Sequence, residues 1–288
     1  MTRAFAHDRF TYPLPEGHGF PLGRYRMLRE AIEQQGIAGV VEAPGATDDD
    51  LLLAHDPRYL ERVVTGRLSD REVKAVGLPW SPELVERGRR SVGATIAAAR
   101  TALDDGVGIN LGGGTHHAFA GSGKGFCTFN DVVVATRRLR TDGAIARVLV
   151  VDLDVHQGDG THSMLGPDPD ATCLSINGGA NYPFRRVPGD VEEDLPDGTG
   201  DDAYLALYLE QYVAFSELCR DPGDQLYRHA WDDSEGVNIP AGAVYWARGN
   251  AWVLVSAAEM LNELEPSSVA WQALQPPFRR QAEAFLAS

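Results

Sequence analysis

The sequence predicts an α/β protein, a parallel sheet flanked by helices. Along the first 200 residues, apolar β-branched runs such as "ARVLVVDLDVH" (146–156) alternate with segments of helical spacing, which is typical of βαβ units. Two loops of unusual composition follow predicted strands, one after Leu111 and one after Val151. Ligands of such sheets lie beyond the carboxyl ends of the strands, so these loops are the expected place of a functional site.

Glycine, proline and capping residues mark the elements of the first 106 residues. The stretch "YPLPEGHGFPLG" (12–23) is too rich in proline and glycine for a helix or a strand and is predicted to be a loop. Residues 24–36 and 55–66 each have helical spacing and end in glycine. Ser81 and Pro82 are a good N-cap and first-turn pair for the long helix through "ELVERGRRSVGATIAAARTALDDG".

The sequence of the middle part of the chain predicts three strands and one more helix. "VGINLGGG" (107–114) is an apolar strand that ends in glycines, and Asn130 is placed to cap a helix through "DVVVATRRLRTDG". The β-branched run 146–156 suits a buried parallel strand. "ATCLSING" (171–178) predicts another strand.

Composition excludes several classes of protein. The chain has 288 residues, a net charge of −15 and a hydrophobic content of 43%. An acidic chain argues against a nucleic-acid binder, and no apolar run approaches the ~20 residues of a membrane span. The N-terminus lacks the apolar region of a signal peptide, and three distant cysteines do not predict a disulfide framework. We expect a reduced cytoplasmic protein without nucleic-acid or membrane partners; the composition leaves its oligomeric state open.

The composition and pattern of the sequence change near Tyr208. The part beyond it holds four of the five tryptophans and reads as helices and aromatic loops, without a clear β-branched strand. We therefore predict two domains, an incomplete α/β domain at 1–208 and a helical segment at 209–288.

The loop "VVDLDVHQGDGTH" (150–162) carries a candidate metal site. At the end of this strand, a bend of the chain can make Asp154 and His156 converge on one ion. One carboxylate oxygen and one imidazole nitrogen suit Zn²⁺ or a similar metal ion. The alternative is that Asp152 and Asp154 only cap the start of a helix.

In the loop after Leu111, His116 and His117 follow a run of three glycines. Adjacent histidines in such a loop are candidate metal ligands, or acid–base groups that are each oriented by a carboxylate. Asp152 and Asp159 are available as these carboxylates if the two loops meet. Phe126 is a candidate wall of a narrow apolar channel, or a core residue.

"GGGTHHAFAGSGKGFCTFND" and "VVDLDVHQGDGTH", supported by "YPLPEGHGFP", "HDPRYLE" and "LPDGTGDDAYLAL", resemble the histone deacetylase superfamily, in particular its class IV-like bacterial branch. The resemblance covers about residues 5–207. It implies an arginase/deacetylase-like α/β fold, one catalytic Zn²⁺, and hydrolysis of ε-acetyl-lysine or related acylated amines.

The resemblance also implies the cation sites. Asp154 and His156 would be zinc ligands. A monovalent cation, K⁺, would be held by the backbone carbonyls of Asp154, His156 and Ile176 together with the side chains of Asp152 and Ser175.

The remaining implied roles concern proton transfer and the substrate. His116 and His117 would be the paired histidines, oriented by Asp152 and Asp159 respectively, with His117 as the general base. Phe126 would line the channel for the acyl-lysine side chain.

Two features of that family are not found in the sequence. The third zinc ligand is an aspartate in a Gly-x-Asp context, and the oxyanion-stabilising tyrosine follows a Gly-Gly pair. Asp232 is at about the right distance beyond His156, but "YRHAWDDSEG" is not the motif. Because a catalytic zinc usually has three protein ligands, we expect weak or absent turnover.

The tail resembles a different family. "RDPGDQLYRHAWDD" and "YWARGNAWVLVSAAEML" are similar to unsaturated uronyl and rhamnogalacturonyl hydrolases, which form an α/α barrel, over about residues 210–285. His229, Arg248 and Trp252 match residues that contact the sugar acid in that family. The alternative is a helical packing module.

Three functions follow from these patterns. The first is a zinc-dependent deacylase, active or degraded, acting on acyl-lysine or an acylated small amine. The second is a non-catalytic binding protein that keeps a deacetylase scaffold. The third is a carbohydrate hydrolase that acts through the tail.

Overall fold

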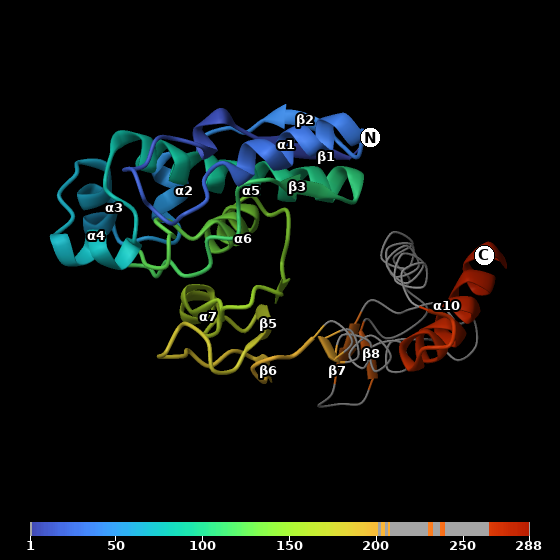
Figure 1. Ribbon diagram of the computed structural model, residues 1–288. Coiled ribbons are helices and arrows are strands. Elements are labelled where there is room, and N and C mark those ends of the chain that lie inside the picture. The colour runs from blue at the N-terminus through green and yellow to red at the C-terminus, as the bar shows by residue number, and fades with distance from the viewer. Residues whose placement is uncertain are drawn as a thin grey trace. The chain divides into compact units, whose positions relative to one another are not determined.

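The computed structural model divides the chain into two compact units, Met1–Asp197 and Gly198–Ser288, which are described separately (Figure 1). The structure describes residues 2–200, 203–204, 207, 230–232, 237–239 and 265–287. Among these residues, no helix is both long enough and apolar enough to span a lipid bilayer.

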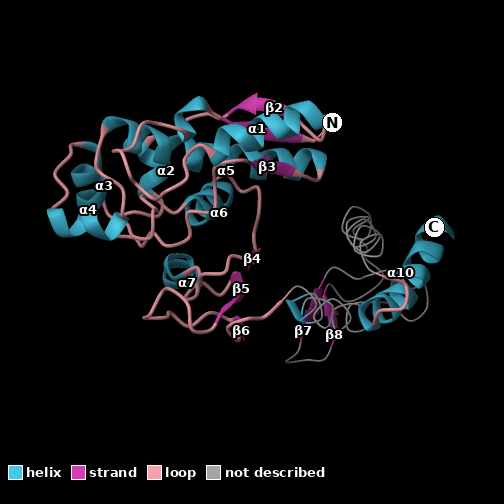
Figure 2. Cartoon of the chain, in the orientation of Figure 1, coloured by secondary structure: helices cyan, strands magenta, loops and turns pink. Residues whose placement is uncertain are grey.

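The first unit contains two three-stranded parallel sheets (Figure 2). The first has the order β2-β1-β3 and consists of β1 Arg3–Ala6, β2 Gly39–Glu42 and β3 Gly108–Asn110. The second has the order β4-β5-β6 and consists of β4 Val148–Asp152, β5 Ala171–Gly178 and β6 Val191–Leu195. The predicted class, parallel sheet flanked by helices, is confirmed, with the strands divided between two sheets.

Helices connect and flank these strands. They are the 3-10 helix η1 Asp8–Phe10, α1 Arg24–Gln35, α2 Asp48–Leu52, α3 Pro57–Val64, α4 Asp70–Val76, α5 Pro82–Asp105, α6 Asp131–Thr141 and α7 Asp159–Leu165. The predicted caps are present: Ser81 accepts a hydrogen bond from Leu84 N at 3.2 Å, and Asn130 accepts one from Val133 N at 3.0 Å. Both bonds satisfy first-turn N–H groups that have no partner within the helix.

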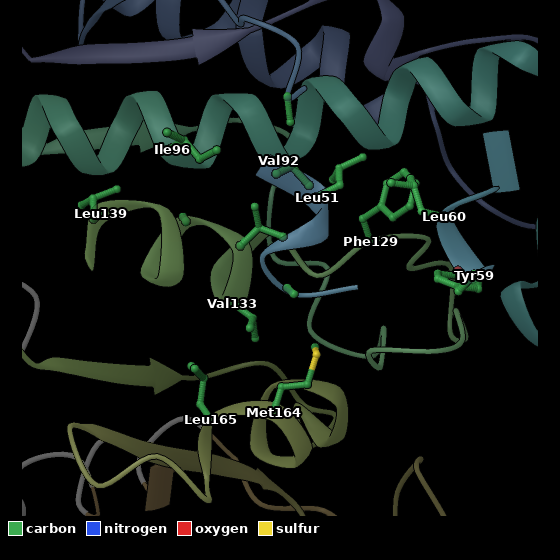
Figure 3. Close-up of a cluster of buried hydrophobic side chains, with 14 of the residues drawn as sticks. Leu51, Tyr59, Leu60, Val92, Ile96, Phe129, Val133, Leu139, Met164 and Leu165 are labelled. Atoms are coloured by element: carbon green, nitrogen blue, oxygen red, sulfur yellow. The ribbon is translucent and has the colours of Figure 1, made fainter. Parts of the chain in front are cut away.

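One apolar cluster ties the long helix α5 to the elements around the second sheet. It runs from α5 through α6 to α7 (Figure 3) and includes Val92, Val133 and Leu165, none of which is exposed. Burying each such side chain contributes about 1.5–3 kcal/mol. The cluster therefore fixes α6 and α7, the two helices that begin where the functional loops end.

The prediction that 146–156 forms a buried strand is only half right. Strand β4 pairs with β5 as a parallel strand, and Val148 and Val150 pack against the apolar cluster. Leu149 and Val151 point to the other face of the sheet and are 62% and 50% exposed. A β-branched run indicates a strand, but it does not reveal whether a second layer covers its outer face.

The second unit is helical toward its end, as predicted, and it also contains a hairpin. Strands β7 Ala230–Asp232 and β8 Val237–Ile239 pair antiparallel, and α10 spans Val269–Ala287. The sequence indicated no clear strand beyond residue 208, because segments of three residues are too short to show alternation.

His55, in the segment before α3, makes hydrogen bonds to the loop that carries His116 and His117. Its side chain is 3% exposed, Nδ1 lies 3.1 Å from the Phe119 carbonyl, and Nε2 accepts from Asn130 N at 3.0 Å. A ring that donates at one nitrogen and accepts at the other is neutral. Burial lowers the pKa of His55 to about 4, although carbonyl contacts act in the opposite direction.

We predict that this histidine makes the first unit acid-sensitive. Its folded pKa, about 4, lies below the value of about 6.5 in unfolded chains, so the unfolded state binds more protons between these values. The stabilisation is therefore complete above pH 6.5 and is lost as the pH falls toward 4. Urea denaturation should show a loss of about 2 kcal/mol between pH 6.5 and pH 5 from this residue. His55→Asn should be less stable at pH 7 but less pH-dependent; equal slopes for the two proteins would contradict this assignment.

Candidate active site

The carboxylate of Asp131 holds the glycine-rich loop that carries both histidines. It is 1% exposed, and it accepts hydrogen bonds from Gly114 N at 3.0 Å, Thr115 N at 2.7 Å and Thr115 Oγ1 at 2.6 Å. Thr95 Oγ1 of α5 donates a fourth at 2.5 Å. A Cβ on Gly113 would lie 2.6 Å from the same carboxylate, so the second glycine of this loop allows the close approach.

The other loop bends immediately after β4, as the sequence suggested. Asp152 accepts from Asp154 N at 3.1 Å, and Asp154 accepts from His156 N at 2.8 Å. Helix α7 begins after Gly158, which provides no side-chain cap. Neither Asp152 nor Asp154 caps that helix, so the structure does not support the purely capping alternative.

The two loops meet through two histidine–aspartate pairs. His116 Nδ1 lies 2.6 Å from Asp152 Oδ2, and His117 Nδ1 lies 2.8 Å from Asp159 Oδ1. The two imidazole rings have centroids 4.1 Å apart. Both predicted contacts are therefore present, and each leaves Nε2 of its histidine available for other chemistry.

The two histidines have opposite electrostatic environments. Burial acts to lower the pKa of His116, but the hydrogen bond and charge of Asp152, with the charge of Asp154, raise that pKa above its usual value. Burial is also the largest influence on the pKa of His117, and together with the charges of His116 and Lys124 it outweighs the hydrogen bond and charge of Asp159, so that pKa lies below its usual value.

Asp154 and His156 converge as two ligands of one ion would. Asp154 Oδ1 lies 3.0 Å from His156 Nδ1, close to the separation of about 3.3 Å between two ligands of a tetrahedral zinc. Among the described residues, no group of three or more His, Cys, Asp and Glu side chains gathers in a way that could hold a metal. These residues therefore fit two of the three usual protein ligands.

Other predicted site residues belong to the tail. Asp232 ends strand β7 in the second unit, and its side chain lies outside the described residues. His229, Arg248 and Trp252 lie outside the described residues altogether.

Two of the proposed monovalent cation ligands, Asp152 and Ser175, lie side by side on strands β4 and β5. Ser175 lies opposite Asp152 in the register of these strands, and Gly178 N donates to Val155 O at 2.9 Å. Ser175 is 0% exposed, and its Oγ has no hydrogen-bond partner among the described residues. An orphaned buried hydroxyl needs an explanation, and a cation ligand is one that fits this position.

A cavity of about 310 Å³ opens onto both histidines, Asp154 and His156. Phe126, predicted to line a channel, is among its lining residues; the ring is 41% exposed and packs against Phe20 with centroids 4.6 Å apart. Its φ of 65° is unusual for a residue other than glycine. The tight turn presents this ring to the cavity.

Two residues near this site were missed by the sequence analysis. Tyr182 places its ring 5.0 Å from that of His117 and 5.9 Å from that of His156, and Lys124 forms an ion pair with Asp159. One signal was available for the lysine: the chain has only two lysines, Lys74 and Lys124.

Comparison with protein families agrees with this geometry. Residues 18–220 match the model of the histone deacetylase domain. The chain belongs to the histone deacetylase family. Residues 195–287 match a second model, that of glycosyl hydrolase family 88, in agreement with the resemblance of the tail.

Individual proteins are also similar to this chain. An uncharacterized protein of Picosynechococcus sp. is 39% identical over 204 residues, which are 70% of this chain and 68% of that protein. Histone deacetylase 2 of Arabidopsis thaliana is 36% identical over 205 residues, 65% of this chain and 52% of the relative. The chain thus spans about half the length of the Arabidopsis relative.

A comparison with solved structures agrees with this family. The crystal structure of a histone deacetylase homologue from Aquifex aeolicus superimposes with a TM-score of 0.63 at 22% identity, and the match covers 77% of this chain and 66% of that one. At this identity the likeness concerns the fold, and it confirms the deacetylase-like architecture.

We predict that Asp131→Ala destabilises the first unit by about 3 kcal/mol, because the N–H groups of Gly114 and Thr115 lose their shared acceptor. Asp131→Asn keeps one carbonyl oxygen and should lose about half as much. Chemical denaturation measures both, with the exposed Asp105→Asn as a control. A loss below about 0.5 kcal/mol for Asp131→Ala would show that the loop is held by other contacts.

Proposed function

We propose that this protein is a cytoplasmic, zinc-dependent amide hydrolase that removes acetyl or other acyl groups from lysine or a related amine. The proposal rests on one observation: the histidines of the two histidine–aspartate pairs line the same cavity as Asp154 and His156. Names of relatives support the reaction class: histone deacetylase 2 of Arabidopsis and a histone deacetylase-like amidohydrolase of Pseudomonas aeruginosa.

In this proposal Asp154 and His156 hold the zinc ion. Bound zinc supplies a Lewis acid for the amide carbonyl and lowers the pKa of a water molecule. The two histidines then divide the proton transfers. His117 donates Nδ1–H to Asp159, so its Nε2 accepts the proton of the attacking water.

His116 has the complementary role. Asp152 and Asp154 favour its protonated form, so it is suited to stabilise developing negative charge and to protonate the departing amine. A K⁺ ion at Asp152, Ser175 and the three carbonyls would fix the carboxylate that orients this histidine. The buried hydroxyl of Ser175, which has no hydrogen-bond partner within the described part of the chain, supports that site.

We expect one weakly held zinc ion and little or no deacetylase turnover. Two matched ligands hold the metal less firmly than three, and an oxyanion without its side-chain donor costs about 2.7–4 kcal/mol in barrier height if the tyrosine resembles other oxyanion donors. Metal analysis and a fluorogenic acetyl-lysine assay measure both. Asp154→Asn and His156→Ala should each abolish zinc uptake, whereas the exposed Asp70→Asn should not.

The same assay tests the non-catalytic alternative and the role of Asp232. Absence of zinc uptake by the purified chain would favour a binding protein on a deacetylase scaffold. Robust, chelator-sensitive turnover would contradict the expectation of weak activity. If Asp232→Ala then abolished both zinc uptake and turnover, Asp232 would be the third ligand.

A carbohydrate hydrolase activity is the further candidate for the tail, and the match of residues 195–287 to glycosyl hydrolase family 88 favours it. Hydrolysis of an unsaturated uronyl disaccharide that is lost in Arg248→Ala would support this function.

A further inference from the structure

Lys124 is fixed next to His117 by its own backbone. Its N–H donates to Cys127 O at 3.1 Å, and its carbonyl accepts from Cys127 N at 2.9 Å, which closes a tight turn. Gly125 within that turn has φ +56°, and a Cβ there would lie 2.6 Å from the His117 ring. The turn thus packs against one side of His117 and sends the side chain of Lys124 past it.

The ammonium group of Lys124 binds the carboxylate that orients His117. Its Nζ contacts Asp159 Oδ2, while Asp159 Oδ1 contacts His117 Nδ1 at 2.8 Å and Gly160 N at 3.1 Å. Asp159 is 0% exposed. Both carboxylate oxygens are therefore occupied, which leaves the group one orientation, with Oδ1 toward His117.

Lys124 also lies close to two aromatic rings. The ammonium lies 5.0 Å from the centroid of the Tyr182 ring and 5.4 Å from that of Phe119, both within the range of cation–π attraction. The Tyr182 ring stands at 83° to the ring of His117. One side chain thus links the glycine-rich loop, the start of α7 and the loop of Tyr182.

The other histidine lacks this arrangement. Asp152 orients His116 from the end of β4, and among the described residues no lysine or arginine lies within 4 Å of its carboxylate. The ion pair of Lys124 is specific to the pair that contains the proposed general base. An ion pair between two exposed side chains would not be specific to one of the two histidine–aspartate pairs, and neither of its partners would be fully buried.

We propose that Lys124 is a positioning residue: its ammonium group fixes the Asp159 carboxylate and thereby the tautomer and orientation of His117. The positioning itself is a property of the folded chain. Its effect on turnover rests on the proposed hydrolase function.

Nuclear magnetic resonance tests the positioning without requiring activity. Protein labelled with ¹⁵N in its lysine side chains has two ammonium groups, and Lys74→Arg assigns the remaining signal to Lys124. We expect that signal to be shifted from the position of an exposed lysine and to return there in Asp159→Asn. An exposed-lysine signal for Lys124 in the otherwise wild-type chain would overturn the proposal. This readout does not depend on whether a variant of Lys124 folds.

Histidine-labelled protein gives the second readout. His117 should carry its proton on Nδ1 in the wild type, in Lys124→Arg and in the control Lys74→Met. Lys124→Met, which keeps the length of the side chain and loses the charge, should give a mixture of the Nδ1–H and Nε2–H forms. Unchanged His117 nitrogen signals in a folded Lys124→Met protein would refute the positioning role.

Kinetics separate this proposal from the proposed function. With zinc-loaded protein, Lys124→Met should lower kcat about 10-fold and leave KM within about twofold, because Lys124 is not among the residues that line the cavity. Lys124→Arg should restore most of kcat. Equal kcat in wild type and Lys124→Met would overturn the catalytic consequence. Absence of both zinc uptake and turnover in the wild type, together with the expected resonance changes, would refute the hydrolase function while supporting the position of Lys124.

Discussion

The candidate active site depends on one buried carboxylate that performs no chemistry in it. Asp131 begins α6 and collects hydrogen bonds from Gly114, Thr115 and Thr95. Backbone N–H groups in a glycine-rich loop need an acceptor when water is excluded, and here a helix-terminal aspartate provides it. The position of His116 thus follows from the packing of α6 against α5, which the apolar cluster fixes.

This support explains how two adjacent histidines acquire different properties. Neighbouring side chains usually share one environment, but His116 and His117 turn toward different aspartates on different elements, the end of β4 and the start of α7. The pair of His117 includes the positive charge of Lys124, whereas the ring of His116 lies near two carboxylates, Asp152 and Asp154. These unequal charges contribute to the opposite pKa directions of the two buried rings.

The sequence was most informative where several histidine and aspartate residues lie close together in the chain. Asp152 and Asp159 were predictable as partners of the two histidines if the two loops meet, and the resemblance to histone deacetylases implied which aspartate pairs with which histidine. The exposure of Leu149 was not predictable, since it depends on what covers the sheet rather than on the strand itself. Lys124 was missed because its reach depends on a turn with positive φ at Gly125 and Phe126, which no periodicity reveals.

The exposed outer face of β4 affects how the protein behaves in solution. Leu149 and Val151, with Leu153 and Val155 beyond the strand, form an apolar row that favours association between molecules. The net charge of −15 opposes association by repulsion. Added salt screens that repulsion, with a Debye length of only about 10 Å at 0.1 M, and leaves the apolar attraction in place. Ionic strength therefore sets the balance between a dispersed and a self-associating protein.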